Sequence, residues 1–382
     1  MKILFKNLSK TSRQSLSLFI FLVSICSVNG QTKPQDSTKT EKLDEVLVKA
    51  VRVDAKSPIT HSNITKEELA KRNLGQDIPM LLNFLPSVVT TSDAGAGVGY
   101  TGIRVRGVSA QSTNLTINGI PFNDSESLGT FWVNLGDFAS SVESLQLQRG
   151  VGTSTNGSGA FGASINILTD AVSKEASGEI SNSFGSFNTR KHTVKFSTGL
   201  MNDHFEIAGR LSNISSDGYI DRASADLKSY FLQGSYVDDN TLIKAITFGG
   251  SEVTYQAWYG INADQLAADR TFNTSGEYTD DNGVTQFYDN EVDNYNQDHF
   301  QLHWNQRYNN NWSTNIGLNY TYGRGYYEQF REDDDFSTYG FEELTVNGET
   351  VNTTDLVRRR WLDNDFYVFN ASANYKDNNI DM

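Results

Sequence analysis

One glycine-rich segment has the residue types and spacing that could bind a nucleotide phosphate. Gly157-Ser158-Gly159-Ala160-Phe161-Gly162 fits the G-x-G-x-x-G pattern. That chemistry needs a helix directly after the glycines, because the N–H groups of a helix N-terminus hold the phosphate. Residues 163–167 (ASINI) instead predict a strand. Turn formation and close backbone approach therefore explain these glycines better than dinucleotide binding does.

Two other groups of side chains could bind a metal ion. His299 and His303 are four residues apart on a predicted strand, which separates them by roughly 13 Å, too far for one ion. The acidic run 333–335 lacks the alternation with glycine of a Ca²⁺ loop, which favours solvated surface. No nucleophile is paired with a base. We therefore expect neither an enzyme nor a bound metal or cofactor.

Two longer glycine-rich stretches indicate a different class of protein. They read GYTGIRVRGVSAQSTNLTINGIPFNDSESLGTFW at 99–132 and SSVESLQLQRGVGTSTNGSGAFGASINILTD at 140–170. Together they resemble the plug domain of TonB-dependent outer-membrane receptors. The resemblance implies a domain that closes the lumen of a large β-barrel and opens when a scarce nutrient binds.

We expect this plug to span 53–170. Helices are predicted over 66–73, with Thr65 and Glu68 as a capping box, and over 77–85, ending before Pro86. Short strands are predicted at 88–91, 103–105, 115–118, 142–148 and 163–169. Asn118-Gly119 predicts a tight turn. By the resemblance, Arg104, Arg106 and Arg149 pair with carboxylates of the barrel wall and seat the plug.

The N-terminal 52 residues predict export and energy coupling. Residues 1–30 have a basic start and a short apolar run, as in a signal peptide, with cleavage expected before Gln31; a membrane anchor is the alternative. Residues 31–52 predict a flexible linker. Within it, 44–50 (DEVLVKA) has strand propensity and resembles the segment that docks on TonB by strand addition. The coupling residues are Asp44, Glu45, Val46, Leu47 and Val48.

Composition excludes two classes of function. Cys26 is the only cysteine and lies in the predicted signal peptide, so no disulfide framework is expected. The net charge is −14, and residues 1–30 carry four basic and no acidic residues, so cleavage makes it more negative. Such a charge argues against nucleic-acid binding, because phosphates would be repelled.

Residues 171–382 predict the N-terminal part of an outer-membrane β-barrel. Eight strands are expected at about 177–186, 189–199, 203–214, 227–237, 240–253, 297–308, 312–326 and 360–375. Their connections alternate between short turns, such as 238–239, and long loops at 215–226, 254–296 and 327–359. This sorting of loops to two rims is typical of outer-membrane barrels. A soluble β-sandwich is the alternative.

Side-chain alternation along these strands favours the membrane. In 298–308, one face carries Phe300, Leu302 and Trp304, expected to meet lipid. The other face carries His299, Gln301, His303, Asn305 and Arg307, expected to meet water or plug. The expected fold is thus mostly β, an α+β plug followed by antiparallel transmembrane strands.

Eight strands are fewer than a plug needs. A plug of this size fits a barrel of about 22 strands, whereas eight enclose little more than their own side chains. We therefore expect the chain to be part of a longer receptor or a truncated relic, with a compact plug beside an open, curved sheet. Such a product should not form a stable plugged pore.

The expected function is that of a TonB-dependent receptor that imports a ferric siderophore or another iron complex across the outer membrane of a Gram-negative bacterium. Its partners would be TonB with ExbB and ExbD, and outer-membrane lipid. The resemblance favours a ferric-citrate-like branch. Cobalamin, an oligosaccharide or a peptide remain alternative cargoes, and a passive porin, an adhesin or a secreted glycan-binding sandwich remain alternative classes. Candidate ligand-binding residues are Phe122, Asn123, Trp132, Tyr255, Trp258, Tyr259, Tyr326, Tyr327 and Arg331.

Overall fold

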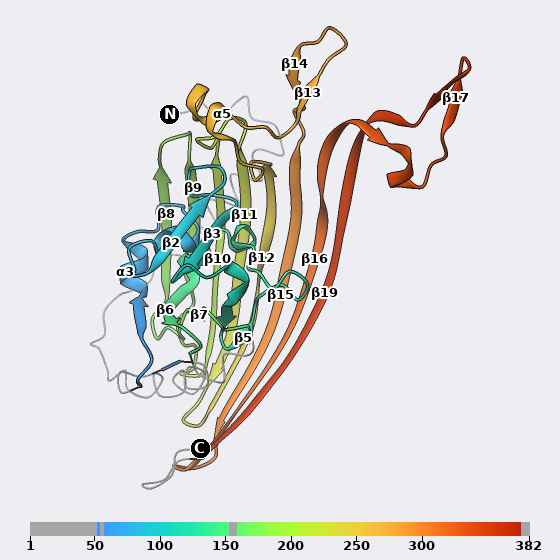
Figure 1. Ribbon diagram of the computed structural model, residues 1–382. Helices are drawn as coiled ribbons and strands as arrows, with labels where there is room; N and C mark the ends of the chain where they lie inside the picture. The colour runs from blue at the N-terminus through green and yellow to red at the C-terminus, as the bar shows by residue number, and fades with distance from the viewer. Residues whose placement is uncertain (1–51, 54–56, 153–158, 376–382) are drawn as a thin grey trace, which may run out of the picture. The chain divides into compact units, whose positions relative to one another are not determined.

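The computed structural model describes residues 52–53, 57–152 and 159–375. They form a small mixed sheet with short helices, followed by a large antiparallel sheet (Figure 1). The predicted signal peptide and the coupling segment 44–50 lie outside the described residues. In the described ranges, no helix is both long and apolar enough to cross a membrane.

The small sheet has the strand order β1-β6-β7-β4-β5. Its strands are β1 (His61–Thr65), β4 (Thr113–Ile117), β5 (Ile120–Pro121), β6 (Val142–Arg149) and β7 (Ala163–Thr169). Strands β4 and β7 are parallel, and the other pairs are antiparallel. A separate hairpin pairs β2 (Val88–Ser92) with β3 (Thr101–Val105). All five predicted strands are confirmed, whereas β1 and the two-residue β5 were not predicted.

Local sequence signals explain the helices and turns of this region. Helix α3 (Lys66–Ala70) begins at the predicted capping box, in which Thr65 and Glu68 bond each other's backbone N–H. Helix α4 (Ile78–Leu81) is shorter than predicted and also ends before Pro86. Asn118 and Gly119 both have positive φ, which is what a two-residue hairpin turn between β4 and β5 requires. Short 3₁₀ helices lie at η1 (Ala110–Ser112), η2 (Trp132–Leu135) and η3 (Phe138–Ser141).

The large sheet contains all eight predicted strands, in the order β19-β16-β15-β12-β11-β10-β9-β8. They are β8 (Ser177–Phe184), β9 (Arg190–Ser197), β10 (Phe205–Ser216), β11 (Ala225–Val237), β12 (Thr241–Tyr255), β15 (Val292–Arg307), β16 (Trp312–Asp335) and β19 (Thr353–Tyr375). Each strand pairs with its sequence neighbour, and β8 and β19 form the two edges of an open sheet, as expected.

Several strands are longer than predicted and shorten the long loops. Strand β16 continues to Asp335 and β19 begins at Thr353, so much of the predicted loop 327–359 is strand. What remains holds η5 (Phe336–Tyr339) and a hairpin of β17 (Leu344–Val346) with β18 (Glu349–Val351). The connection between β12 and β15 holds α5 (Ala263–Ala268) and a hairpin of β13 (Glu277–Thr279) with β14 (Thr285–Phe287). Figure 1 shows both hairpins beyond the same end of the sheet.

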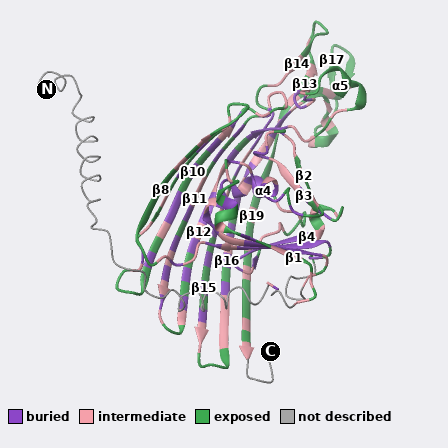
Figure 2. Ribbon diagram, turned by 90° about the vertical axis from the view of Figure 1, so that its left-hand side faces the viewer, coloured by how far each residue is buried: buried purple, intermediate pink, exposed green. Residues whose placement is uncertain are grey.

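Burial alternates along the large sheet with a period of two residues, as Figure 2 shows. On β15, His299, Gln301 and His303 are buried, whereas Phe300 and Leu302 are exposed. The same outward face carries exposed Val194, Leu211, Leu232, Leu318 and Phe369 on other strands. The predicted register of β15 is therefore confirmed, and the exposed face is apolar as lipid contact requires.

The inward face of the large sheet and the small sheet share one hydrophobic core. Phe138, the first residue of η3, packs on Phe231 of β11 and Phe248 of β12, with ring centroids 6.3 and 5.0 Å apart. The same cluster contains Leu145, Ile165 and other buried residues of the small sheet. This burial fixes the small region against the strands and positions its loops over them.

Candidate functional site

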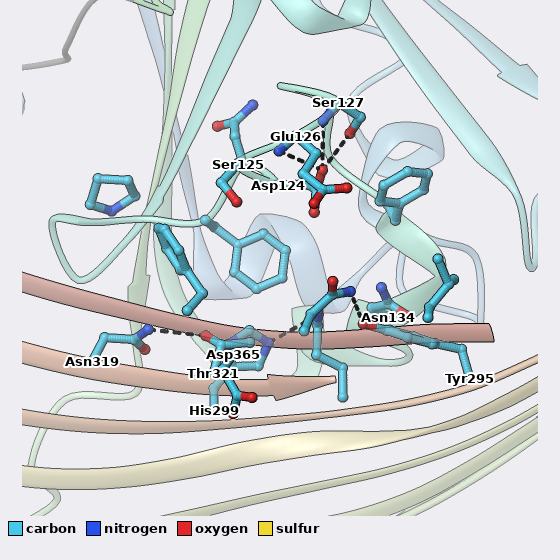
Figure 3. Close-up of a pocket in the computed structure, with 18 of the residues that line it drawn as sticks. Asp124, Ser125, Glu126, Ser127, Asn134, Tyr295, His299, Asn319, Thr321 and Asp365 are labelled. Carbon is cyan, nitrogen blue, oxygen red and sulfur yellow. Dashed lines mark hydrogen bonds between the residues drawn. The ribbon is translucent and has the colours of Figure 1, made fainter. Parts of the chain in front are cut away.

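An open cavity of about 380 Å³ lies between the small region and the large sheet. One wall is the segment 120–127, which follows the hairpin turn at Asn118-Gly119. The opposite wall is the inward face of β12, β15, β16 and β19. Figure 3 shows Asp124, Ser125, Glu126 and Ser127 on the first wall, facing His299, Asn319 and Thr321 on the second.

The first wall is held by side-chain hydrogen bonds to its own backbone. Asn123 Oδ1 accepts from Leu115 N at 2.7 Å, and its Nδ2 donates to the carbonyls of Thr113 and Leu128. Asp124 Oδ1 accepts from the N–H and hydroxyl of Ser127 at 2.7 and 2.8 Å. These bonds form a turn of the kind that Asp and Asn favour, so the loop presents Glu126 on an ordered base.

The second wall is polar where it meets the small region. Asn118 Nδ2 donates to Gln301 Oε1 at 3.3 Å, and His303 contacts Gln301 Oε1 at 3.1 Å. His299 contacts Thr321 Oγ1 at 2.8 Å, and the ring of Phe122 lies 5.0 Å from its imidazole. His299 and His303 thus take part in separate polar contacts.

Two buried carboxylates close one end of the cavity. Glu252 of β12 and Asp293 of β15 both line it and are 3% and 4% exposed. The hydroxyl of Tyr100, in the turn before β3, donates to Asp293 Oδ2. Burial raises the pKa of Tyr100, and the neighbouring carboxyl groups of Glu252 and Asp293 raise it further. Tyr100 is therefore held as a neutral donor.

Aromatic side chains continue from Tyr100 toward the long connection after β12. The indole of Trp258 contacts Tyr100, Tyr259 and Tyr327 edge-on, at centroid distances of 5.2, 6.4 and 6.1 Å. Arg360 Nη1 donates to Tyr327 Oη at 3.0 Å. The cluster joins the small region, a loop and β16 beside the cavity, and edge-on contacts of this kind stabilise such a junction.

The predicted ligand-binding residues divide into three groups. Phe122 and Asn123 line the cavity. Trp258, Tyr259 and Tyr327 form the adjoining aromatic cluster, and Tyr255 lies behind it, where its hydroxyl donates to Tyr288 O at 2.7 Å. The remaining members, Trp132, Tyr326 and Arg331, lie away from the cavity.

These three residues are placed where the sequence prediction did not expect them. Trp132 is buried in the shared core. Tyr326, expected at the end of the strand beside the loop, lies within the longer β16 and packs on exposed Trp361 at 4.8 Å, on the face opposite the cavity. Arg331 is near the end of β16 and pairs with Asp334 at 3.6 Å. Strand β16 extends beyond residue 326, so Arg331 lies on a strand where a loop was predicted. A ligand-binding role of these three residues stays a prediction.

The three arginines predicted to seat the plug have no carboxylate partner on the described strands. Arg104 and Arg106 are exposed. Arg149 is buried in the small region, where its Nε donates to Pro86 O at 3.0 Å and Nη2 to Ser62 Oγ at 2.9 Å. The seating role of these arginines therefore stays a prediction.

In the buried ion pairs between the small region and the sheet, the carboxylate belongs to the small region and the cations belong to the sheet, the reverse of the predicted arrangement. Asp137, between η2 and η3, pairs with Lys191 of β9 at 2.6 Å and with Arg210 of β10 at 3.6 Å. This cluster was not predicted from the sequence. The sequence could have indicated it, because the alternation of β9 and β10 places Lys191 and Arg210 on the inward face, and a buried cation needs a partner of opposite charge.

The chain was compared with known proteins. Residues 53–164 match the family described as the TonB-dependent Receptor Plug Domain. The chain is 25% identical over 261 residues to the probable TonB-dependent siderophore receptor PirA of Acinetobacter baumannii, covering 63% of this chain and 32% of that protein. It is 27% identical over 226 residues to the ferrienterobactin receptor of Escherichia coli, covering 56% and 29%. The vitamin B12 transporter BtuB of Vibrio vulnificus is 27% identical, covering 46% and 28%.

Solved structures share the fold. The siderophore receptor PirA from Acinetobacter baumannii superimposes with a TM-score of 0.56 at 18% identity, covering 82% of this chain and 45% of that one. FpvA of P. aeruginosa, bound to a pyoverdine–iron complex, gives a TM-score of 0.60 at 11% identity, covering 85% and 41%. The chain thus spans about a third of the length of these curated relatives.

Proposed function

We propose that this chain, a TonB-dependent receptor by its plug domain and fold, forms part of an outer-membrane receptor that binds a ferric siderophore and imports it into the periplasm. Energy would come from TonB, with ExbB and ExbD, acting on residues 44–50. The cavity between the plug and β12, β15, β16 and β19 would hold the ligand. No covalent chemistry is required for this activity.

One relationship carries the proposal. The plug packs against the polar, inward face of a sheet whose outward face is apolar and exposed. A soluble sandwich would bury that outward face, because large exposed apolar surfaces are avoided in water. A passive porin would not need a domain fixed in its lumen by a shared core and buried ion pairs.

The proposed cargo rests on the relatives. Two carry siderophore or ferrienterobactin in their names, and one is a vitamin B12 transporter. A ferric complex is therefore our first candidate and cobalamin the second. Among ferric complexes, the ferric-citrate-like ligand expected from the plug motifs stays a prediction.

Uptake by cells tests this function. Cells that produce the protein from its gene should take up iron-55 chelates under iron limitation, and cells lacking TonB should bind the chelate without importing it. Membrane fractionation should place the protein in the outer membrane. A protein recovered in the soluble periplasm, or chelate uptake that does not depend on TonB, would contradict the proposal. Uptake of cobalamin in place of iron would select the second cargo.

A further inference from the structure

The cavity beside the plug is lined by acidic side chains without basic ones. Six carboxylates lie along it, and among the described residues that line it none is Lys or Arg. The six are Asp124, Glu126, Glu252, Asp293, Asp363 and Asp365.

Two of these carboxylates are neutralised nearby. Arg324, on the outward face of β16, pairs with Asp363 at 2.5 Å and with Asp365 at 3.2 Å. Asp124 accepts hydrogen bonds from the N–H and hydroxyl of Ser127 in its own loop. Glu126 is exposed at the end of that loop. The negative charge of the cavity therefore rests on Asp124 and Glu126, because carboxyl groups as buried as Glu252 and Asp293 do not hold a charge without a cation beside them. Glu252 and Asp293 instead contribute buried oxygens to the cavity wall.

A second, independent observation is that the cavity wall contains buried acceptor oxygens without hydrogen-bond donors. Three buried oxygens of its wall have no hydrogen-bond partner: Glu252 Oε2, Asp293 Oδ1 and Asn319 Oδ1. All three are acceptors, and their residues are at least nine-tenths buried. A buried acceptor without a donor costs about 1–3 kcal/mol, and more if it is charged. A ligand that supplies N–H donors or positive charge would recover this energy.

Two basic residues further along the same face of β19 are already engaged in hydrogen bonds. Arg358 lies further along β19 and donates to Gln329 Oε1 at 2.7 Å, and Arg360 donates to Tyr327 at 3.0 Å. Both lie beyond the last β19 residue that lines the cavity, Leu362. They are placed to hold the aromatic cluster, not to neutralise the carboxylates.

Building on the proposed function, we infer that this cavity selects a ferric chelate of neutral or positive net charge with amine or amide donors on its periphery. A tris-hydroxamate carries as much negative charge as Fe(III) carries positive, so its complex is neutral, and a free amine makes it cationic. A tris-catecholate complex is a trianion. Like charges brought into a partly desolvated site repel strongly, which disfavours the trianion here.

Three probes test the inference by charge alone. They are the ferric complex of a linear tris-hydroxamate with a free amine, the same complex with that amine acetylated, and a ferric tris-catecholate. Binding of each iron-55 complex is measured on ice to cells producing the full chain, with cells lacking it as background. We expect the amine complex to bind about tenfold more tightly than its acetylated form, a difference of about 1.4 kcal/mol, and the tris-catecholate to compete poorly.

Two isosteric variants then assign the effect to the cavity. Glu252→Gln and Asp293→Asn should each remove most of the preference for the amine over its acetylated form. Asp226→Asn, on the exposed β11 pair with Lys228, is the matched control and should keep it. Should a buried variant fail to reach the outer membrane, Glu126→Lys on the exposed loop replaces it, and this variant should improve tris-catecholate binding.

The results separate this inference from the proposed function. Tris-catecholate binding as tight as that of the amine complex, unchanged by Glu126→Lys, would overturn the charge preference while supporting a siderophore receptor. If none of the three complexes binds to protein that has reached the outer membrane, the proposed function is wrong and the inference falls with it.

Discussion

Asp137 of the plug and Lys191 of β9 form an ion pair of 2.6 Å in which the side chains are 0% and 2% exposed. Thr193 and Ser212 also donate to Asp137 Oδ2, at 2.6 and 2.7 Å. Arg210 lies 3.6 Å away on β10. One plug carboxylate thus satisfies two buried cations and two hydroxyls of neighbouring strands, and a buried pair of this kind is costly to break.

Asp137→Asn should loosen the plug. The substitution leaves Lys191 and Arg210 buried with no carboxylate between them, and removing one partner of a buried pair costs about 3–5 kcal/mol. We expect faster proteolysis within residues 57–170 and a lower unfolding midpoint in urea, measured on protein in outer-membrane vesicles.

Asp226→Asn provides the comparison. Asp226 pairs with Lys228 at 3.5 Å, but both side chains are more than half exposed. Exposed pairs contribute about 0–1 kcal/mol, so this variant should resemble the unmodified protein. Equal effects of the two substitutions would show that burial of the Asp137 pair is unimportant.

The Asp137 cluster should also make plug stability depend on pH. Burial alone would raise the pKa of Asp137, but Arg210 and Lys191 outweigh it and lower that pKa well below its ordinary value. An unfolded Asp has a pKa of about 3.9. Because the folded pKa is lower, the stabilisation is complete above this value and is lost as the pH falls from it toward the folded pKa.

The comparison of two pH profiles isolates this effect. The free energy of unfolding is measured between neutral pH and the most acidic condition at which refolding is reversible. The difference between unmodified protein and Asp137→Asn should be constant above pH of about 5 and shrink below about 4. A difference that stays constant through the acid range would contradict the ion-pair assignment.

Gly323→Ala should disturb the cavity without unfolding the sheet. A Cβ at this position would lie 1.9 Å from Tyr295 Oη, so the Tyr295 ring, which lines the cavity, must move. The hydrogen bond from Asn364 Nδ2 to Tyr295 Oη, 2.9 Å long, would be lost. We expect chelate binding to weaken several-fold, since such a bond contributes about 1 kcal/mol.

Gly317→Ala is the control on the same strand and face. Its Cβ would meet His303 at 3.5 Å, an ordinary contact, so neither binding nor stability should change appreciably. Equilibrium binding of the iron-55 chelate measures both variants. A Gly317→Ala defect as large as that of Gly323→Ala would remove Tyr295 as the explanation.

The strand register predicts unequal tolerance of charge. Leu302 is 44% exposed on the outward face, so Leu302→Arg would place a cation in lipid and should cost about 2–4 kcal/mol near the midplane. Gln301 was expected to meet water or plug, but it is 5% exposed and bonded to Asn118 of the plug, so it is a poor control for Arg substitution. Half-buried Asn315 of β16 is a better one.

Urea unfolding in lipid vesicles compares Leu302→Arg with Asn315→Arg. The first should lower the free energy of unfolding and the second should change it by less than about 1 kcal/mol. Equal losses would mean that the outward face does not meet lipid.

Val46→Pro should separate binding from transport. If 44–50 is recruited as an added strand, proline removes an N–H that the strand pairing needs. Chelate binding to cells should persist while uptake is abolished. Thr38→Pro, in the predicted linker before this segment, controls for the proline itself and should leave uptake intact. Normal uptake by Val46→Pro would exclude this coupling segment.

The sequence by itself determined the local elements of this protein. The period of two in residues 298–308, the Asn118-Gly119 turn and the Thr65–Glu68 capping box are each encoded within a few neighbouring residues, and each is present as predicted. The glycine-rich stretches likewise identified the plug, because turn chemistry is local. The ends of β16 and β19 were underestimated, since polar and aromatic residues there alternate too weakly to distinguish strand from loop.

Only the tertiary structure decided which distant residues meet. Asp137 and Lys191 are 54 positions apart in the numbering, and Tyr100 and Asp293 are separated by 193. Their contacts depend on how the plug is oriented over the inward face, which the shared core of Phe138, Phe231 and Phe248 sets. A one-residue shift of any strand would exchange its two faces. The residues of the cavity are therefore a property of packing and register, which no local pattern in the chain encodes.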